Sequence, residues 1–102
     1  MQFMFSSKTV ELTDKVKNFM QEKVNHLQKF SSLGLNQLQV VIDRVKRGGR
    51  TTSEAQIEIV AQVKGERYAF KEVGDNLYQT FYRVFHKVEQ KLGKEKEERR
   101  RR

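Results

Sequence analysis

Two stretches of the chain show the apolar spacing of amphipathic helices. In the first, Thr13 is suited to cap a helix that ends near residues 31–32, and Gly34 can take the left-handed conformation in which a chain leaves a helix. We expect the second helix to begin at Gly74 and Asp75 and to be interrupted by Gly93. In both stretches apolar residues recur at spacings of three and four; they are Val16, Phe19, Met20, Val24, Leu27 and Phe30 in the first and Leu77, Phe81, Val84, Phe85, Val88 and Leu92 in the second.

Four shorter stretches alternate between apolar and polar residues, which is typical of strands that bury one face of a sheet. Phe3 and Phe5 mark the first strand, which precedes the first helix. A turn at residues 46–50 separates the second strand from the third, and a hairpin turn at residues 64–67 leads into a last strand around residues 68–71. The buried faces of the second and third strands are expected to carry Leu38, Val40, Ile42, Ala55, Ile57, Ile59, Ala61 and Val63.

The predicted order of elements is strand, helix, three strands, helix. Each helix has an apolar stripe that must be buried, and the sheet has one apolar face. Packing both helices on that face buries all three apolar surfaces. The expected fold class is therefore α+β, a two-layer sandwich of a four-stranded sheet with two helices packed on one face. A chain of 102 residues is long enough for one core. We assign residues 1–93 to this single domain and residues 94–102, which contain no apolar residue, to a charged C-terminal tail or a solvated helical extension.

The charge balance points to a polyanionic partner without identifying it. Lys and Arg number 21 against 13 Asp and Glu, which gives a formal charge of +8. The absence of cysteine excludes a disulfide framework, a thiolate metal site and a cysteine nucleophile, and it fits a reducing compartment. No apolar run approaches the length of a membrane span, and the N-terminus lacks the features of a signal peptide. We therefore expect a soluble, cytoplasmic protein that has no membrane partner.

Catalytic chemistry has little support in the sequence. His26 and His86 fall on the polar surfaces of the two helices, with no metal-ligand spacing and no paired nucleophile and base. Asp43 and Glu58 lie on strands, where surface acids are more often solvated than catalytic. The glycines at 48, 49 and 65 fall in turns between strands rather than in a strand-to-helix loop that cradles phosphate. We expect a binding protein that is not an enzyme and uses no metal or other cofactor.

Basic residues gather on one flank of each helix. At about 100° per residue, one flank of the second helix carries Arg83, Lys87, Lys91 and Lys94. On the first helix the comparable flank carries Lys15, His26 and Lys29, with Lys23 close to the apolar boundary. Cations one helical turn apart, about 5 to 6 Å, match the spacing of phosphates along folded RNA, although charge that serves only solubility explains the pattern equally well. Tyr78 and Tyr82 flank the apolar stripe, a place that is more often the edge of a core than a stacking surface for unpaired bases.

Several residue strings recur in this order of elements in one known family. They are Met1, Gln2 and Phe3; Val10, Glu11, Leu12 and Thr13; Phe19, Lys23 and Leu27; and, most specifically, Leu77, Tyr78, Lys87, Val88, Leu92, Lys94 and Lys96 in the second helix. The chain resembles the short form of the hibernation-promoting factor and ribosome-associated inhibitor family, also called sigma-54 modulation proteins. The resemblance covers nearly the whole chain. The order and spacing of these strings together carry the resemblance.

The resemblance implies a ribosome hibernation factor. Members bind the small (30S) ribosomal subunit and its 16S RNA in the channel that messenger RNA and transfer RNA use, and they inhibit translation in stress or stationary phase. The implied RNA contacts are Lys17, Lys23, His26, Lys87, Lys94 and Lys96, of which His26 stands where lysine is common. The chain departs from the pattern at Asn76, Tyr82 and His86, where members tend to carry acids.

Other interpretations remain open at the level of sequence. Long members of the family add a C-terminal domain that pairs ribosomes, and we expect none after Leu92; short members either assist or oppose pairing. A generic module for double-stranded RNA also places helices on one face of a small sheet. A protein-interaction regulator, such as a modulator of transcription, would bring the basic flank against an acidic protein surface. We expect a monomer when the protein is not bound to the ribosome.

Overall fold

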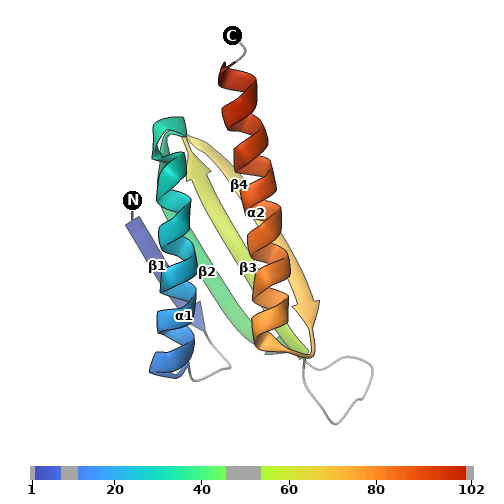
Figure 1. The fold of residues 1–102 in the computed structure, drawn as a ribbon. Coiled ribbons are helices and arrows are strands. Elements are labelled where there is room, and N and C mark those ends of the chain that lie inside the picture. The colour runs from blue at the N-terminus through green and yellow to red at the C-terminus, as the bar shows by residue number, and fades with distance from the viewer. Residues whose placement is uncertain (1, 8–11, 46–53, 101–102) are drawn as a thin grey trace.

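The computed structural model describes residues 2–7, 12–45 and 54–100. Its elements, drawn in Figure 1, are β1 (Gln2–Ser7), α1 (Asp14–Asn25), the 3₁₀ helix η1 (His26–Leu33), β2 (Leu35–Val45), β3 (Glu54–Val63), β4 (Glu66–Gly74) and α2 (Leu77–Arg100). This order confirms the predicted sequence of strands and helices. The turn expected at residues 46–50 lies outside the described residues.

The four strands form one sheet with the order β1-β2-β3-β4. β1 runs parallel to β2, while β2 with β3 and β3 with β4 are antiparallel. The parallel pair follows from the connection through α1, because parallel neighbours need a crossover and a helix commonly provides it. Both helices cover the same face of the sheet, as Figure 1 shows, so the predicted two-layer α+β sandwich is confirmed.

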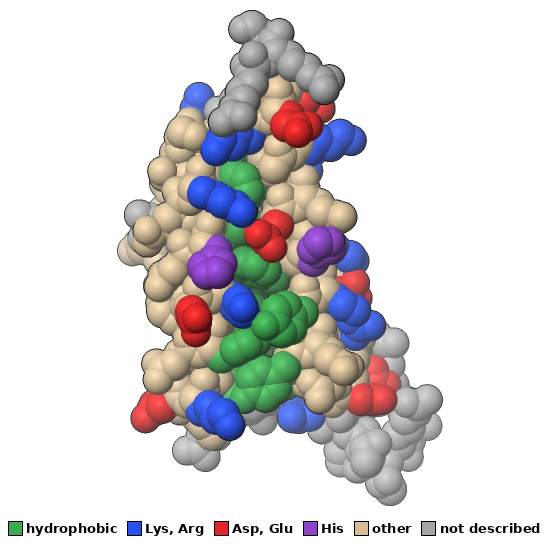
Figure 2. All heavy atoms as spheres, in the orientation of Figure 1, with side chains coloured by type: hydrophobic (Ala, Val, Ile, Leu, Met, Phe, Trp, Pro, Cys, Tyr) green, Lys and Arg blue, Asp and Glu red, His purple; other side chains and the backbone are tan. Residues whose placement is uncertain are grey.

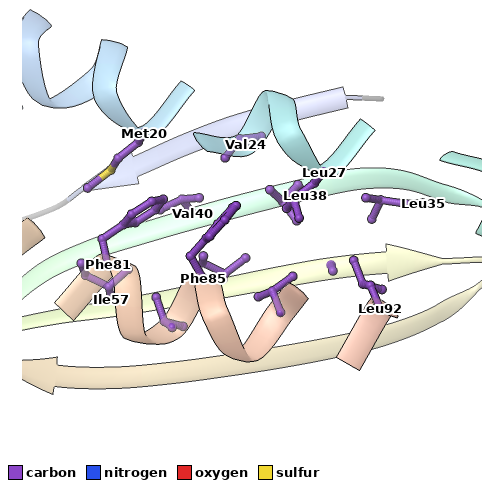
Figure 3. Close-up of a cluster of buried hydrophobic side chains, with 14 of the residues drawn as sticks. Met20, Val24, Leu27, Leu35, Leu38, Val40, Ile57, Phe81, Phe85 and Leu92 are labelled. Carbon is purple, nitrogen blue, oxygen red and sulfur yellow. The ribbon is translucent and has the colours of Figure 1, made fainter. Parts of the chain in front are cut away.

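The core lies between the sheet and the two helices. Alternate residues of β2 and β3 point into it, among them Leu38, Val40 and Ile57, which are completely buried. Met20 from α1 and Phe81 from α2 meet them from the helix layer, as Figure 3 shows. The expected alternation in β2 and β3 is therefore confirmed, since the predicted apolar residues of both strands are buried. The opposite sheet face carries the alternating polar residues and is open to solvent.

The first helix begins as predicted and ends differently. The Thr13 hydroxyl accepts a hydrogen bond from the amide of Val16 at 3.3 Å, and Gly34 has φ of 93°. The last turns, however, are 3₁₀ rather than α. Their buried residues Leu27, Phe30 and Leu33 are spaced by three, and side chains three apart align in a 3₁₀ helix, so this geometry turns all of them toward the core.

The second helix starts later and continues further than predicted. It begins at Leu77, where the Asn76 side chain accepts a hydrogen bond from the amide of Gln79 at 3.0 Å. The interruption expected at Gly93 is wrong, because α2 runs through this residue to Arg100. A glycine in a helix costs only about 1 kcal/mol relative to alanine, and an ion pair between Lys91 and Glu95 (3.2 Å) bridges the position from one turn to the next. The expected tail is therefore a helical extension over its described part.

Gly74 lies at the end of β4, where the sheet and α2 approach each other closely. A methyl group at this position would overlap the Arg83 guanidinium and the Thr80 hydroxyl. The arginine can swing away, but Thr80 is completely buried and donates a hydrogen bond to the Asn76 carbonyl at 2.6 Å. The Thr80 side chain therefore cannot move aside to make room for a methyl group at Gly74.

Gly74→Ala should accordingly lower the free energy of unfolding by about 1–3 kcal/mol, as overpacking does. Urea unfolding followed by circular dichroism measures the change. Gly93→Ala is the matched control: nothing lies within 4 Å of an added Cβ there, and alanine favours the helix, so that variant should gain up to about 1 kcal/mol. Equal effects at the two glycines would contradict the close approach at Gly74.

Candidate nucleic-acid interface

The two helices form the outer layer of one face of the molecule, and side chains of different kinds are sorted across it. Figure 2 shows apolar side chains gathered between α1 and α2, with Lys and Arg around them and one histidine over each helix. We call the line of contact between the helices the helix seam. It consists of Phe19, Lys23 and Lys29 from α1 and η1 and of Tyr78, Tyr82, Glu89 and Lys96 from α2.

Aromatic contacts build the first half of the helix seam. The ring centroid of Phe19 lies 5.0 Å from that of Tyr78 and 5.5 Å from that of Tyr82, both with the rings nearly perpendicular. Edge-to-face pairs of this kind are favourable beyond the area they bury. The Lys23 ammonium lies 5.3 Å from the Tyr82 ring centroid, within range of a cation–π interaction. A positive charge and an aromatic surface therefore lie together at the outer edge of the seam.

Polar contacts build the second half of the helix seam. The Lys29 ammonium lies 3.5 Å from the Glu89 carboxylate, and the Lys96 ammonium donates to the Lys29 carbonyl, also at 3.5 Å. Lys29 and Lys96, both predicted RNA contacts, are 67 residues apart in sequence and are brought together here. Because Lys96 follows Gly93, its contact with η1 also ties the helical extension to the rest of the fold.

The predicted basic flank of α2 faces β4, on the side away from the seam. We call Arg83, Lys87, Lys91 and Lys94 the outer flank. The Arg83 guanidinium donates to the Val73 carbonyl at 3.1 Å, and Lys87 forms an ion pair with Glu72 at 2.8 Å. Lys91, besides its pair with Glu95, lies 5.4 Å from the Tyr68 ring centroid. Three of the four cations therefore already have partners, and phosphate would have to compete with them.

The ion pair between Lys87 and Glu72 affects the titration of the carboxyl group. The hydrogen bond from Lys87 lowers the pKa of Glu72 below its usual 4.5; partial burial opposes the shift, and the charges of Lys87 and Arg83 add to it. A lowered folded-state pKa means that the stabilisation is present above the unfolded-state value and is lost as the pH falls through the lowered pKa.

Glu72→Gln should therefore lower the free energy of unfolding at neutral pH by no more than about 1 kcal/mol, since half of the Lys87 side chain is exposed and the pair is screened. At a pH below the lowered pKa of Glu72 the variant and the original chain should be equally stable. Unfolding curves over a pH series give the comparison. A stability difference that persists into acid would show that Glu72 contributes through packing rather than through its charge.

The remaining predicted residues separate into two groups. His26 lines a surface hollow of about 610 Å³ together with Lys23 from the seam and Lys87 from the outer flank. Lys15 is exposed on α1. Lys17 instead lines a different hollow, formed with Phe5, Ser6, Ser7 and Leu12 beside β1. The structure thus brings most of the predicted cations onto one face and separates Lys17 from them.

Sequence reasoning missed several residues of this face. Glu72 and Glu89 form ion pairs with predicted RNA-contacting lysines. Each acid lies at least 15 residues from its lysine in the sequence, so no local pattern links the two residues of a pair. His86 lines the same hollow as His26 and was expected to be only a polar surface residue. Among the described residues no three His, Asp or Glu side chains come close enough together to hold a metal ion. None of the described helices combines the length and apolar character needed to cross a membrane.

Comparison with known proteins agrees with the resemblance seen in the sequence. No curated protein matches the chain. A solved structure of a ribosomal subunit interface protein from Coxiella burnetii superposes with a TM-score of 0.77 at 14% identity, covering 94% of this chain and 98% of that one. The N-terminal domain of Protein Y from Thermus thermophilus superposes with a TM-score of 0.74 at 19% identity, covering 90% and 96%. These two similarities show a shared fold.

A model of a protein family also matches the amino-acid sequence of the chain. The model describes the sigma 54 modulation protein / S30EA ribosomal protein family, and it matches residues 3–100. The matched range includes both helices, β2, β3 and β4, and all of β1 except its first residue. The chain therefore belongs to the sigma 54 modulation protein / S30EA ribosomal protein family.

Proposed function

We propose that this protein binds the small ribosomal subunit through its helix face and inhibits translation by occupying the channel for messenger RNA and transfer RNA. The observation that carries the proposal is the family match over residues 3–100, because the family is described as one of ribosomal proteins. The Coxiella protein with the same fold is itself named a ribosomal subunit interface protein. In this proposal the protein acts in the cytoplasm as a monomer, under stress or in stationary phase, by steric occupation and without a catalytic step.

The charges of the helix face support binding to the phosphates of RNA, which in this proposal is 16S RNA. Lys23, Lys29 and Lys96 lie at the seam, and the outer flank adds four further cations beside it. The ion pairs that hold some of them are exposed, and exposed pairs contribute at most about 1 kcal/mol. Phosphate groups can therefore replace the carboxylates, and each lysine that changes partner releases a counterion from the RNA.

Sedimentation with purified small subunits tests the proposal. We expect the protein to move with the subunits, and added transfer RNA and messenger RNA to displace it, because all three would occupy one channel. Binding that survives a large excess of both competitors would contradict the proposed site. Failure to sediment with the subunits at all would contradict the proposed function.

The same preparation separates the two alternatives. Equal affinity for any RNA duplex would favour a generic double-stranded RNA module. A partner complex that resists ribonuclease would favour a protein-interaction regulator, in which the outer flank meets an acidic surface. Under the ribosome proposal, a plain duplex should bind more weakly than the subunit, and ribonuclease should release the protein.

A further inference from the structure

The helix face also carries an aromatic surface that its packing leaves uncovered. We propose that Tyr82 is a stacking platform for an unpaired base, so that the RNA bound by this face includes a single-stranded nucleotide. This inference rests on the proposed function and deepens it, since it names the kind of RNA element that the site takes.

The Tyr82 side chain is unusually exposed. Of the large apolar side chains in the described residues, only Met4 and Tyr82 are exposed, with 37% and 46% of their surface accessible. The other aromatic residues of the helix layer are buried or half-buried. Phe19 meets the Tyr82 ring nearly at a right angle, at 76°, so it does not cover the ring as a parallel stacked partner would. The ring is therefore held in place by Phe19 and remains accessible.

The ring lies in a hollow that has an apolar side. Tyr82 lines the surface hollow of about 610 Å³ that also contains Phe85, His26 and His86. Phe85 and the Tyr82 ring line the hollow, so it has an apolar side against which a flat, largely apolar group could lie. A surface hollow of about 610 Å³ has room for a nucleotide that remains joined to its strand.

Cations lie over and near the ring. The Lys23 ammonium lies over it, 5.3 Å from the ring centroid, and Arg83 and Lys87 line the same hollow, together with the acids Glu72 and Glu89. A base stacked on Tyr82 would displace the Lys23 ammonium from the ring and bring its own phosphate within reach of these cations, and the flexible stem of Lys23 lets the ammonium move to that phosphate. Aromatic side chains interleaved with cations are how proteins hold single strands without reading their sequence.

These three features favour an unpaired nucleotide over a duplex. In a base-paired helix the flat faces of the bases are already stacked on one another, so an exposed tyrosine ring gains nothing from them. A duplex would use only the cations. The combination of an accessible ring, an apolar wall and cations suits a base that has left its helix or belongs to a single strand.

The experiment uses tryptophan as a local reporter. The chain contains no tryptophan, so Tyr82→Trp introduces a single fluorophore at the proposed platform. We expect small subunits and a short oligoadenylate to quench its emission, while a blunt RNA duplex leaves the emission nearly unchanged. Met4→Trp is the matched control, because Met4 is the other exposed large side chain and lies on β1; its tryptophan should respond to none of the three.

Affinity measurements with small subunits complete the test. Tyr82→Ala should weaken binding by about fivefold to a hundredfold, whereas Tyr82→Phe, which keeps the ring, should bind as the original chain does. Circular dichroism must show that both variants fold. Unquenched Tyr82→Trp in the presence of bound subunits, equal quenching by duplex, or unchanged affinity of Tyr82→Ala would each overturn the platform. Because the original chain's binding to subunits is measured alongside, these outcomes leave the proposed function standing, and only loss of that binding would remove it.

Discussion

Phe81→Ala should lower the free energy of unfolding by about 3–5 kcal/mol, the largest effect on stability expected for a single substitution in this domain. Phe81 is completely buried at the centre of the core. Its ring lies 5.7 Å from that of Phe85 and 5.9 Å from that of Phe19, so it joins α2 to both its own next turn and the neighbouring helix. Alanine leaves a cavity between the helix layer and the sheet. Since small domains are stable by only about 5–15 kcal/mol, the variant retains little stability in reserve.

Equilibrium unfolding in urea gives this difference directly if the transition is two-state. His86→Ala is the control on the same helix, because His86 is exposed and its removal should change stability by no more than about 0.5 kcal/mol. If Phe81→Ala lowers the free energy of unfolding by less than about 1.5 kcal/mol, the neighbouring side chains must move to fill the cavity, contrary to the expectation. Binding to small subunits should be lost only to the extent that the variant unfolds.

The sequence is sufficient to predict the elements and the faces they bury. The stripe that includes Val84, Val88 and Leu92 has the period of a helix, and the alternation of Ile57 and Ile59 has that of a strand; all five residues are buried. These patterns are local, because residues three or four apart in a helix, or two apart in a strand, share a face whatever lies opposite. The two-layer architecture then follows from the need to cover every apolar face.

The contacts between elements are not local, and the sequence patterns do not predict which residues form them. Periodicity places Lys87 on a flank of α2, but it does not say that this flank faces β4 and an acid on that strand. The partners Lys29 and Glu89 are 60 residues apart. The geometry of η1 and the continuity of α2 through Gly93 also depend on context, since each local preference at issue is worth only about 1 kcal/mol and tertiary packing overrides it.

The contacts that the outer flank makes with other elements decide which of its residues should be substituted. Arg83 is a poor choice for substitution, because its guanidinium donates to the Val73 carbonyl and lies over Gly74, so its loss would disturb the fold as well as the surface charge. Lys87 and Lys91 form exposed ion pairs, Lys91 also lies over the Tyr68 ring, and Lys94 is exposed. Replacing these three lysines with glutamine keeps the helix and removes three positive charges from one flank.

The triple variant Lys87→Gln, Lys91→Gln and Lys94→Gln should bind small subunits roughly a hundredfold more weakly, if each lysine contributes a charge-assisted contact of about 1 kcal/mol to phosphate. The slope of the logarithm of affinity against the logarithm of salt concentration should fall by about three. Loss of Lys87 also leaves Glu72 without its ion-pair partner, with only the charge of Arg83 still acting on it, which adds repulsion to the lost attraction. Binding titrations at several salt concentrations measure both quantities.

A second triple variant separates the position of the charges from their number. Lys64, Arg67 and Lys71 are exposed, and their replacement by glutamine removes the same net charge. Arg67 and Lys71 alternate along β4 with Tyr68 and Phe70, which pack against the core, so they lie on the sheet face that the helices leave open. If RNA binds the helix face, this variant should keep a nearly unchanged affinity and salt slope. Equal losses of affinity in the two triple variants would mean that the net charge of the protein, rather than the outer flank, drives binding. That result would contradict the helix face as the RNA interface.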